Sequence, residues 1–152
     1  MSSLLILLLV CCCYEASAYD VKRWKQCTDP QKGKVYSLES SEVCDASTCH
    51  LKRGSNVTFT VHFSSGEAVT KAKAVVYGYI DGIKIKFPLP NTDGCQNCGL
   101  TCPLKNGPKY AYHAMVPVQK AYPKIKLVVI WYLMDQSGNN IWCIDVPAVI
   151  TD

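Results

Sequence analysis

Hydrophobic and polar residues alternate along five stretches of this chain, and each stretch is long enough to form a β-strand. Successive side chains of a strand point to opposite faces, so each alternation predicts a strand with one buried face. The stretch at residues 125–133 is the most apolar of the five, because Val128 and Ile130 lie on the face opposite its predicted inward row. The five predicted inward rows are Val57, Phe59, Val61 and Phe63; Ala72, Ala74, Val76, Gly78 and Ile80; Ile83, Ile85 and Phe87; Tyr110, Tyr112, Ala114, Val116 and Val118; and Ile125, Leu127, Val129, Trp131 and Leu133.

Three further segments complete the predicted set of strands. Residues 19–26 alternate loosely, residues 35–38 are short and weakly apolar, and residues 141–150 close the chain. Turn residues separate the segments, and Asp81-Gly82 favours a bulge or a tight hairpin. No stretch sustains a 3.6-residue period. The pattern therefore predicts an all-β fold, an immunoglobulin-like β-sandwich of about seven strands.

The row at residues 83–87 ends at a stiff edge. Pro88 and Pro90 lack a backbone N–H and cannot continue a central ladder, and residues 91–95 have the composition of a turn. An apolar face therefore runs up to a rigid rim. A sandwich that opens between its two sheets would need such an edge.

The first residues of the chain are typical of a secretory signal. An unbroken apolar run from Leu4 to Val10 is followed by Ala16-Ser17-Ala18, the small-residue pattern at which a signal peptidase cuts. The run is too short to span a bilayer comfortably. We therefore expect a signal peptide at residues 1–18 and one domain at residues 19–152, in a secreted protein.

Cysteine content points to disulfides rather than to a metal. Beyond the signal, seven cysteines remain in a secreted chain, a density typical of disulfide-stapled domains. Because seven is odd, one thiol is left over, and we expect it among the closely spaced Cys95, Cys98 and Cys102. Cys95-x-x-Cys98 could supply two zinc ligands, but no second pair of ligands follows at suitable spacing, so no metal is expected.

Charge and motifs argue against several function classes. Loss of Glu15 with the signal leaves sixteen basic and eleven acidic residues, a net charge of +5. The lysines are scattered, which argues against a nucleic-acid partner and is compatible with transient contact with anionic membranes. The carboxylates are dispersed, and neither a G-x-S-x-G nor an H-E-x-x-H motif occurs, so we expect no enzyme and no cofactor.

Several blocks of the chain resemble the ML lipid-recognition family, in its secreted sterol-carrier branch. They match in order and spacing over nearly all of residues 19–152. The blocks are Lys73-Ala74-Val75-Val76-Tyr77-Gly78, Phe87-Pro88-Leu89-Pro90, Asp93-Gly94-Cys95 followed by Cys102-Pro103, Val116-Pro117-Val118, Tyr122-Pro123-Lys124-Ile125-Lys126-Leu127-Val128-Val129 with Trp131, and Cys143-Ile144-Asp145-Val146-Pro147.

The resemblance implies a lipid pocket between the two sheets and a set of residues around it. Phe87, Val118, Tyr122 and Pro123 match the pocket mouth, and Leu51, Ile80, Ile85, Val129 and Trp131 match its walls. Ile144 stands where mammalian members have an aromatic residue, while Trp142 precedes the cysteine. The implied disulfides are Cys27–Cys143, Cys44–Cys49 and Cys95–Cys102, which leave Cys98 as the extra thiol.

The resemblance implies a carrier that binds a cholesterol-like sterol and transfers it between membranes or to a partner, such as a membrane sterol transporter. The alternatives are a carrier of fatty acids or semiochemicals, a lipid-dependent innate-immune recognition protein, and an adhesion domain with a filled core. We expect a monomer, secreted or in the lysosomal lumen. The Asn56-Val57-Thr58 sequon predicts a glycan on Asn56.

Overall fold

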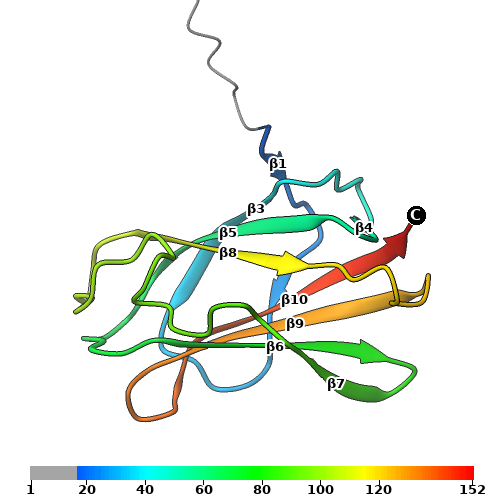
Figure 1. The fold of residues 1–152 in the computed structure, drawn as a ribbon. Coiled ribbons are helices and arrows are strands. Elements are labelled where there is room, and N and C mark those ends of the chain that lie inside the picture. Colours follow the sequence, from blue (N-terminus) through cyan, green and yellow to red (C-terminus); the bar gives the residue numbers. More distant parts are fainter. Residues whose placement is uncertain (1–16) are drawn as a thin grey trace, which may run out of the picture.

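The computed structural model describes residues 17–152, which form two antiparallel layers of β-strands (Figure 1). Apart from Ser17 and Ala18, the expected signal peptide lies outside the described residues. The predicted all-β sandwich is confirmed: no described residue is helical. The strands are β1 (Tyr19–Asp20), β2 (Lys25–Gln26), β3 (Lys34–Ser40), β4 (Cys49–Lys52), β5 (Asn56–Ser64), β6 (Lys73–Ile80), β7 (Ile83–Phe87), β8 (Tyr110–Pro117), β9 (Lys126–Met134) and β10 (Asn140–Thr151).

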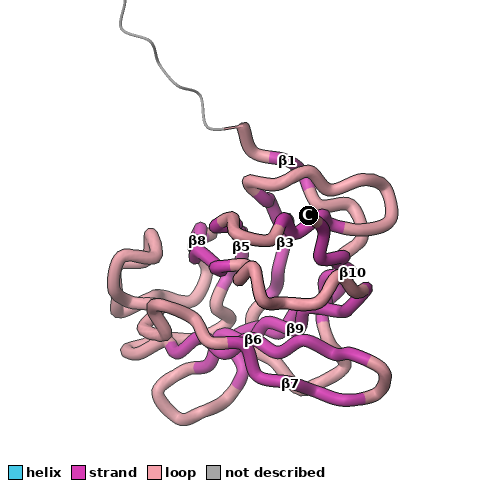
Figure 2. The backbone as a smooth tube through the Cα atoms, turned by 45° about the vertical axis from the view of Figure 1, so that its right-hand side comes forward, coloured by secondary structure: helices cyan, strands magenta, loops and turns pink. Residues whose placement is uncertain are grey.

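The two sheets face each other across the core. One has the order β1-β3-β5-β8, and the other has the order β2-β10-β9-β6-β7 with β4 paired in parallel to β10. Figure 2 shows the layer of β3, β5 and β8 lying above the layer of β6, β9 and β7. On β5, β8 and β9 the buried side chains alternate with more exposed ones, as the sequence pattern predicts. Burying one row per strand is what fixes the register of each pairing.

Ten strands form in the described residues instead of about seven. The seven long ones, β3 and β5 to β10, follow the predicted segments closely. The single edge strand predicted at residues 19–26 is instead two short strands: β1 pairs with β3 and β2 pairs with β10, so this segment crosses from one sheet to the other. The remaining addition, β4, is a four-residue strand.

A tight hairpin joins β6 to β7. Ile80 pairs with Ile83, so the loop has two residues, Asp81 and Gly82. Both have positive φ, 48° and 83°, which is the conformation of a type I′ turn and fits the right-handed twist of the strands. Figure 1 shows the hairpin tip extending at the lower right, beyond the end of β8.

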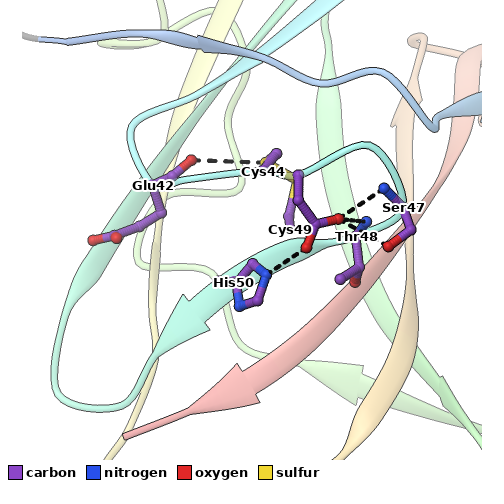
Figure 3. A network of polar contacts seen from close by, with 7 residues as sticks. Glu42, Cys44, Ser47, Thr48, Cys49 and His50 are labelled. Carbon is purple, nitrogen blue, oxygen red and sulfur yellow. Dashed lines mark hydrogen bonds and ion pairs between the residues drawn. A yellow bond between two sulfur atoms is a disulfide. The ribbon is translucent and has the colours of Figure 1, made fainter.

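Three disulfides link the described cysteines in the pairs implied by the resemblance: Cys27–Cys143, Cys44–Cys49 and Cys95–Cys102. The first joins segments 116 residues apart. The second closes the loop before β4, where Asp45 accepts hydrogen bonds from Ser47 and Thr48 and pairs with His50 (Figure 3).

The seventh cysteine, Cys98, is an unpaired thiol that is 2 % exposed. Asn91 Nδ2 donates to its sulfur at 3.3 Å. Burial raises the pKa of the Cys98 thiol, which disfavours the reactive thiolate at neutral pH.

Possible metal ligands converge at one place in the described residues, at Cys27, Cys143 and Asp145. Because the two sulfurs are joined in a disulfide, they are not available as thiolate ligands. Over residues 17–152 there is also no helix long and apolar enough to cross a membrane.

Candidate functional site

An apolar cavity lies between the sheets, near the end of the sandwich where β7 and β9 meet the loop after β8. Its lining comes from both sheets and from this loop, so it opens into the space between the layers. Tyr122 supplies the single hydroxyl of the lining, and every other lining side chain is hydrocarbon. The lining residues are Leu51, Phe59, Val76, Phe87, Val116, Pro117, Val118, Tyr122, Leu127, Val129 and Ile150.

The mouth of this cavity is closed by two aromatic rings. Phe87 ends β7, and Tyr122 lies in the loop between β8 and β9; their ring centroids are 5.3 Å apart with an interplanar angle of 84°. This edge-to-face contact is a favourable aromatic geometry, worth about 1 kcal/mol beyond the buried area. Rotating either ring would separate the pair, so the mouth can open without breaking a strand pairing.

The sequence holds each ring in place by local means. Pro88 follows Phe87 and ends the strand there, and the facing strand β6 has Gly78, where a Cβ atom would collide with the Phe87 ring. The Tyr122 loop is anchored by Arg53, whose Nη1 donates to the Tyr122 carbonyl at 3.3 Å. Arg53 also pairs with Asp152, which in turn pairs with Lys124.

The cavity is small in this conformation, about 30 Å³. That volume suits about one water molecule, whereas pockets for small-molecule ligands measure roughly 300–1,000 Å³. A lipid could therefore enter only if the rings at the mouth rotate and the two sheets move apart.

The core behind the cavity is filled by aromatic side chains. Phe59, which lines the cavity, packs edge-on against Trp131 with ring centroids 5.8 Å apart. The centroids of Trp131 and Tyr112 are 6.0 Å apart. The ring centroids of Tyr112 and Trp142 are 5.7 Å apart, and those of Trp142 and Phe63 are 6.0 Å apart. These rings separate the cavity from the far end of the sandwich.

The residues that the resemblance assigns to the pocket do not all reach this cavity. Leu51, Phe87, Val118, Tyr122 and Val129 line it. Trp131 and Ile144 are fully buried in the core behind it, Ile80 is half-buried against the core, and Pro123 is exposed.

Ile85 lies apart from the cavity. It shares a face with Phe87, as the alternation predicts, but its side chain is 48 % exposed. The reason is its place on an edge strand near the hairpin tip, where the opposite sheet does not cover it. Ile83, on the same face, is 63 % exposed.

Six lining residues were absent from the predicted pocket set. Four of them belong to the predicted inward rows, so alternation alone marks them as inward-facing, and Ile150 belongs to the predicted final strand. Alternation does not tell which inward residues border a space and which fill the core. The six are Phe59, Val76, Val116, Pro117, Leu127 and Ile150.

A larger hollow of about 880 Å³ lies around the Cys95–Cys102 loop. Its lining mixes the charged residues Lys71, Lys73, Asp93 and Asp135 with threonines and glutamines. A mixed, polar and charged lining does not suit an apolar ligand. The small cavity behind Phe87 and Tyr122 is therefore the candidate lipid site.

Comparison with known proteins shows the family to which the chain belongs. Residues 21–150 match the family described as the ML domain. The chain is 43 % identical over 111 residues to the NPC intracellular cholesterol transporter 2 homolog a of Drosophila melanogaster, covering 72 % of this chain and 75 % of the relative. It is 38 % identical over 108 residues to NPC intracellular cholesterol transporter 2 of Mus musculus, covering 71 % of this chain and 72 % of the relative.

A solved structure supports the fold as well. The Niemann-Pick type C2 protein of the Japanese carpenter ant superposes with a TM-score of 0.79 at 26 % identity, covering 85 % of this chain and 99 % of the ant chain. With the family match over residues 21–150, and with the same two-sheet architecture, this chain belongs to the ML-domain family.

Proposed function

We propose that this protein is a non-catalytic lipid carrier that binds a cholesterol-like sterol between its sheets and transfers it between membranes or to a partner protein. The observation that carries the proposal is the apolar cavity behind the Phe87–Tyr122 contact. The fly and mouse relatives are named as cholesterol transporters, which favours a sterol as the ligand.

The energetics suit a carrier that must also release its ligand. A sterol buries several hundred Å² of apolar surface, and at about 25 cal/mol per Å² this contributes on the order of 10 kcal/mol. Association and the opening of the cavity oppose part of that gain. The net affinity would then be high enough for transport and low enough for release.

The surface beside the mouth supports delivery to membranes. Ile83 and Ile85 expose apolar side chains on β7, the strand that ends at Phe87. Lys84 and Lys86 alternate with them and are also exposed. Exposed apolar side chains next to cations favour transient contact with an anionic bilayer, and this contact would bring the mouth close to the lipid.

The remaining parts of the proposal concern where the protein works. The three disulfides fit an oxidising compartment, so we place the protein outside the cell or in the lysosomal lumen, after removal of residues 1–18. Asn56 is exposed at the start of β5, where a glycan can be accommodated. We propose that the carrier is monomeric.

The test is binding of a fluorescent sterol by the purified protein and by two variants. Phe87→Ala removes the ring at the mouth and should weaken binding by about tenfold or more, because apolar contact with the ligand is lost. Tyr36→Ala removes an exposed ring on β3 and should leave binding unchanged; thermal melts establish that both variants fold. Absence of binding by the unaltered protein would refute the proposal, and unchanged binding by Phe87→Ala would refute the assigned mouth.

A fatty acid is the second candidate ligand, and the size of the cavity favours it. Expanding about 30 Å³ to hold one acyl chain requires less separation of the sheets than holding a rigid ring system. Organic extraction of the protein from its native source, followed by mass spectrometry, separates the candidates. Recovery of fatty acids without sterol would replace the first proposal with the second.

A further inference from the structure

A second hollow lies on the outer face of the six-stranded sheet, on the opposite side of that sheet from the lipid cavity. Its volume is about 570 Å³, which lies within the range of small-molecule sites. It crosses the sheet from β2 over β10, β9 and β6 to β7, which are neighbours in that order; Figure 1 shows β10, β9, β6 and β7. We call it the outer groove. Its lining consists of Arg23, Trp24, Lys25, Tyr79, Lys84, Val128, Ile130, Asp145 and Pro147.

The floor of the outer groove is apolar. Val128 and Ile130 are the outward residues of β9, and Pro147 of β10 pairs with Val128. Tyr79 of β6 pairs with Val128 from the other side, and Trp24 lies beside β2. Apolar side chains on the outer face of a sheet are unusual for a surface that only meets water, since such a face is ordinarily polar.

The rim of the groove is cationic. Arg23 and Lys25 lie at the β2 edge and Lys84 at the β7 edge, against one acid, Asp145, in the lining. Lys25 is the cross-strand partner of Asp145. Lys84 donates to the Tyr132 hydroxyl at 3.1 Å and lies over the Tyr77 ring. Lys84 is therefore already engaged by neighbouring side chains, and Lys25 has the acid Asp145 opposite it on the adjacent strand.

Arg23 is the cation that is free to bind a ligand. Its side chain is exposed, and within residues 17–152 it has neither an ion-pair partner nor a side-chain hydrogen bond. A guanidinium matches the two oxygens of a carboxylate with paired N–H donors. An anion bound there would lie at the rim, beside the apolar floor.

We propose that the outer groove is a second binding site, specific for a single-chain carboxylate amphiphile such as a fatty acid. Arg23 binds the carboxylate, and the chain lies over Val128, Ile130 and Pro147 between the rings of Trp24 and Tyr79. The site is a hollow rather than a protruding patch, which suits one chain better than a bilayer surface. A second copy of the protein would bring its own cationic rim against this one, which disfavours self-association here.

Trp24 offers a direct probe of this site. It is half-buried in the groove, whereas Trp131 and Trp142 are 1 % and 0 % exposed in the core. In 2-bromoundecanoate the bromine lies next to the carboxylate, so a chain held at Arg23 places the bromine beside the neighbouring Trp24 and quenches its indole. The difference between the unaltered protein and Trp24→Phe isolates the signal of Trp24. We expect this difference signal to saturate with the carboxylate and to respond much more weakly to the neutral 2-bromoundecan-1-ol.

Variants then test the role assigned to Arg23. Arg23→Gln should weaken the Trp24-specific binding by about tenfold, and Arg23→Lys should weaken it less, because the charge remains without the paired donors. Lys105→Gln makes the same change of net charge on an exposed loop residue outside the groove and should have no effect. Phe87→Ala should also leave this signal unchanged, so the outcome does not depend on the sterol cavity.

Three results would overturn the proposal. One is quenching of Trp24 that rises linearly and never saturates, as random collision gives. Another is an equal loss in Arg23→Gln and Lys105→Gln. The third is equal binding of the carboxylate and the alcohol, which would leave an apolar groove without anion specificity.

Discussion

At the scale of single residues, the polar atoms of three core aromatics have no hydrogen-bond partner in the described part of the chain. They are the Tyr112 hydroxyl and the Nε1 atoms of Trp131 and Trp142. The Tyr112 ring lies edge-on to both indoles. Burial raises the pKa of Tyr112 above its usual value, because the charged phenolate would lose its hydration.

This arrangement makes a prediction for Tyr112→Phe. Removing a buried hydroxyl that has no partner removes a desolvation cost, so the free energy of unfolding should stay the same or rise by about 1 kcal/mol. Tyr132→Phe is the matched control: its hydroxyl donates to Asp29 at 2.9 Å and accepts from Lys84, and its removal should cost about 1 kcal/mol. Urea unfolding of both variants measures the two values. A larger loss for Tyr112→Phe than for Tyr132→Phe would mean that a water or a ligand satisfies the Tyr112 hydroxyl.

At the scale of elements, the loop closed by Cys44 and Cys49 depends on one carboxylate. His50 Nε2 lies 2.8 Å from Asp45 Oδ2, and the backbone N–H groups of Ser47 and Thr48 donate to Oδ1 at 2.7 and 2.8 Å (Figure 3). The bond with His50, followed by those from Ser47 and Thr48, holds the pKa of Asp45 far below its usual value. The ionised carboxylate is therefore the form that stabilises the loop.

The sign of the pH dependence follows from this lowered pKa. A carboxyl group whose folded pKa is below its unfolded value, about 3.9, stabilises the fold fully above that value and loses this contribution as pH falls below it. Asp45→Asn should therefore be less stable than the unaltered protein at neutral pH, and the difference should shrink as the pH is lowered below about 4. Thermal melts across the acid range measure this. A difference that stayed constant with pH would show that Asp45 acts through neutral hydrogen bonds alone.

Whether a strand could be predicted from the sequence depends on its length and on which of its faces are buried. The inward rows of β5, β8 and β9 were predictable because each strand has one face on the core and one toward solvent. Residues 19–26 were not, because two-residue strands carry too few side chains for a period to appear, and the crossing between sheets leaves no pattern. Alternation also marked Ile85 as inward. It cannot show that an edge strand extends past the opposite sheet.

Half of the residues expected at the pocket line the candidate cavity, whereas its volume was not predictable from the sequence. Phe87 and Tyr122 come together as a mouth because Pro88 ends β7 and the Arg53 contact anchors the Tyr122 loop. The cavity behind them is nearly closed, since its size depends on the rotation of side chains and on sheet separation, which residue types do not encode. The burial of Cys98 likewise depends on the three-dimensional fold around its sulfur.

At the scale of the whole molecule, the disulfides constrain very different lengths of chain. Cys27–Cys143 joins residues 116 apart, beside β2 and within β10, and so links the two ends of the domain. Cys44–Cys49 joins residues only 5 apart. In both bridges one sulfur belongs to a fully buried residue, Cys143 or Cys49. The two bridges are thus similar in burial and differ mainly in the loop that they close.

Removing each bridge should therefore have unequal effects. In the chain-entropy treatment, Cys27→Ala with Cys143→Ala should lower the free energy of unfolding by about 5 kcal/mol, and Cys44→Ala with Cys49→Ala by about 2 kcal/mol. Domains of this kind have a total stability of roughly 5–15 kcal/mol, so loss of the long-range bridge should leave the fold marginal at 37 °C, whereas loss of the short one should not. Guanidinium unfolding of the two double variants, in the absence of reductant, measures both values. Equal losses would mean that the bridges act through local packing in the folded state, because loop closure cannot give equal effects for loops of such different length.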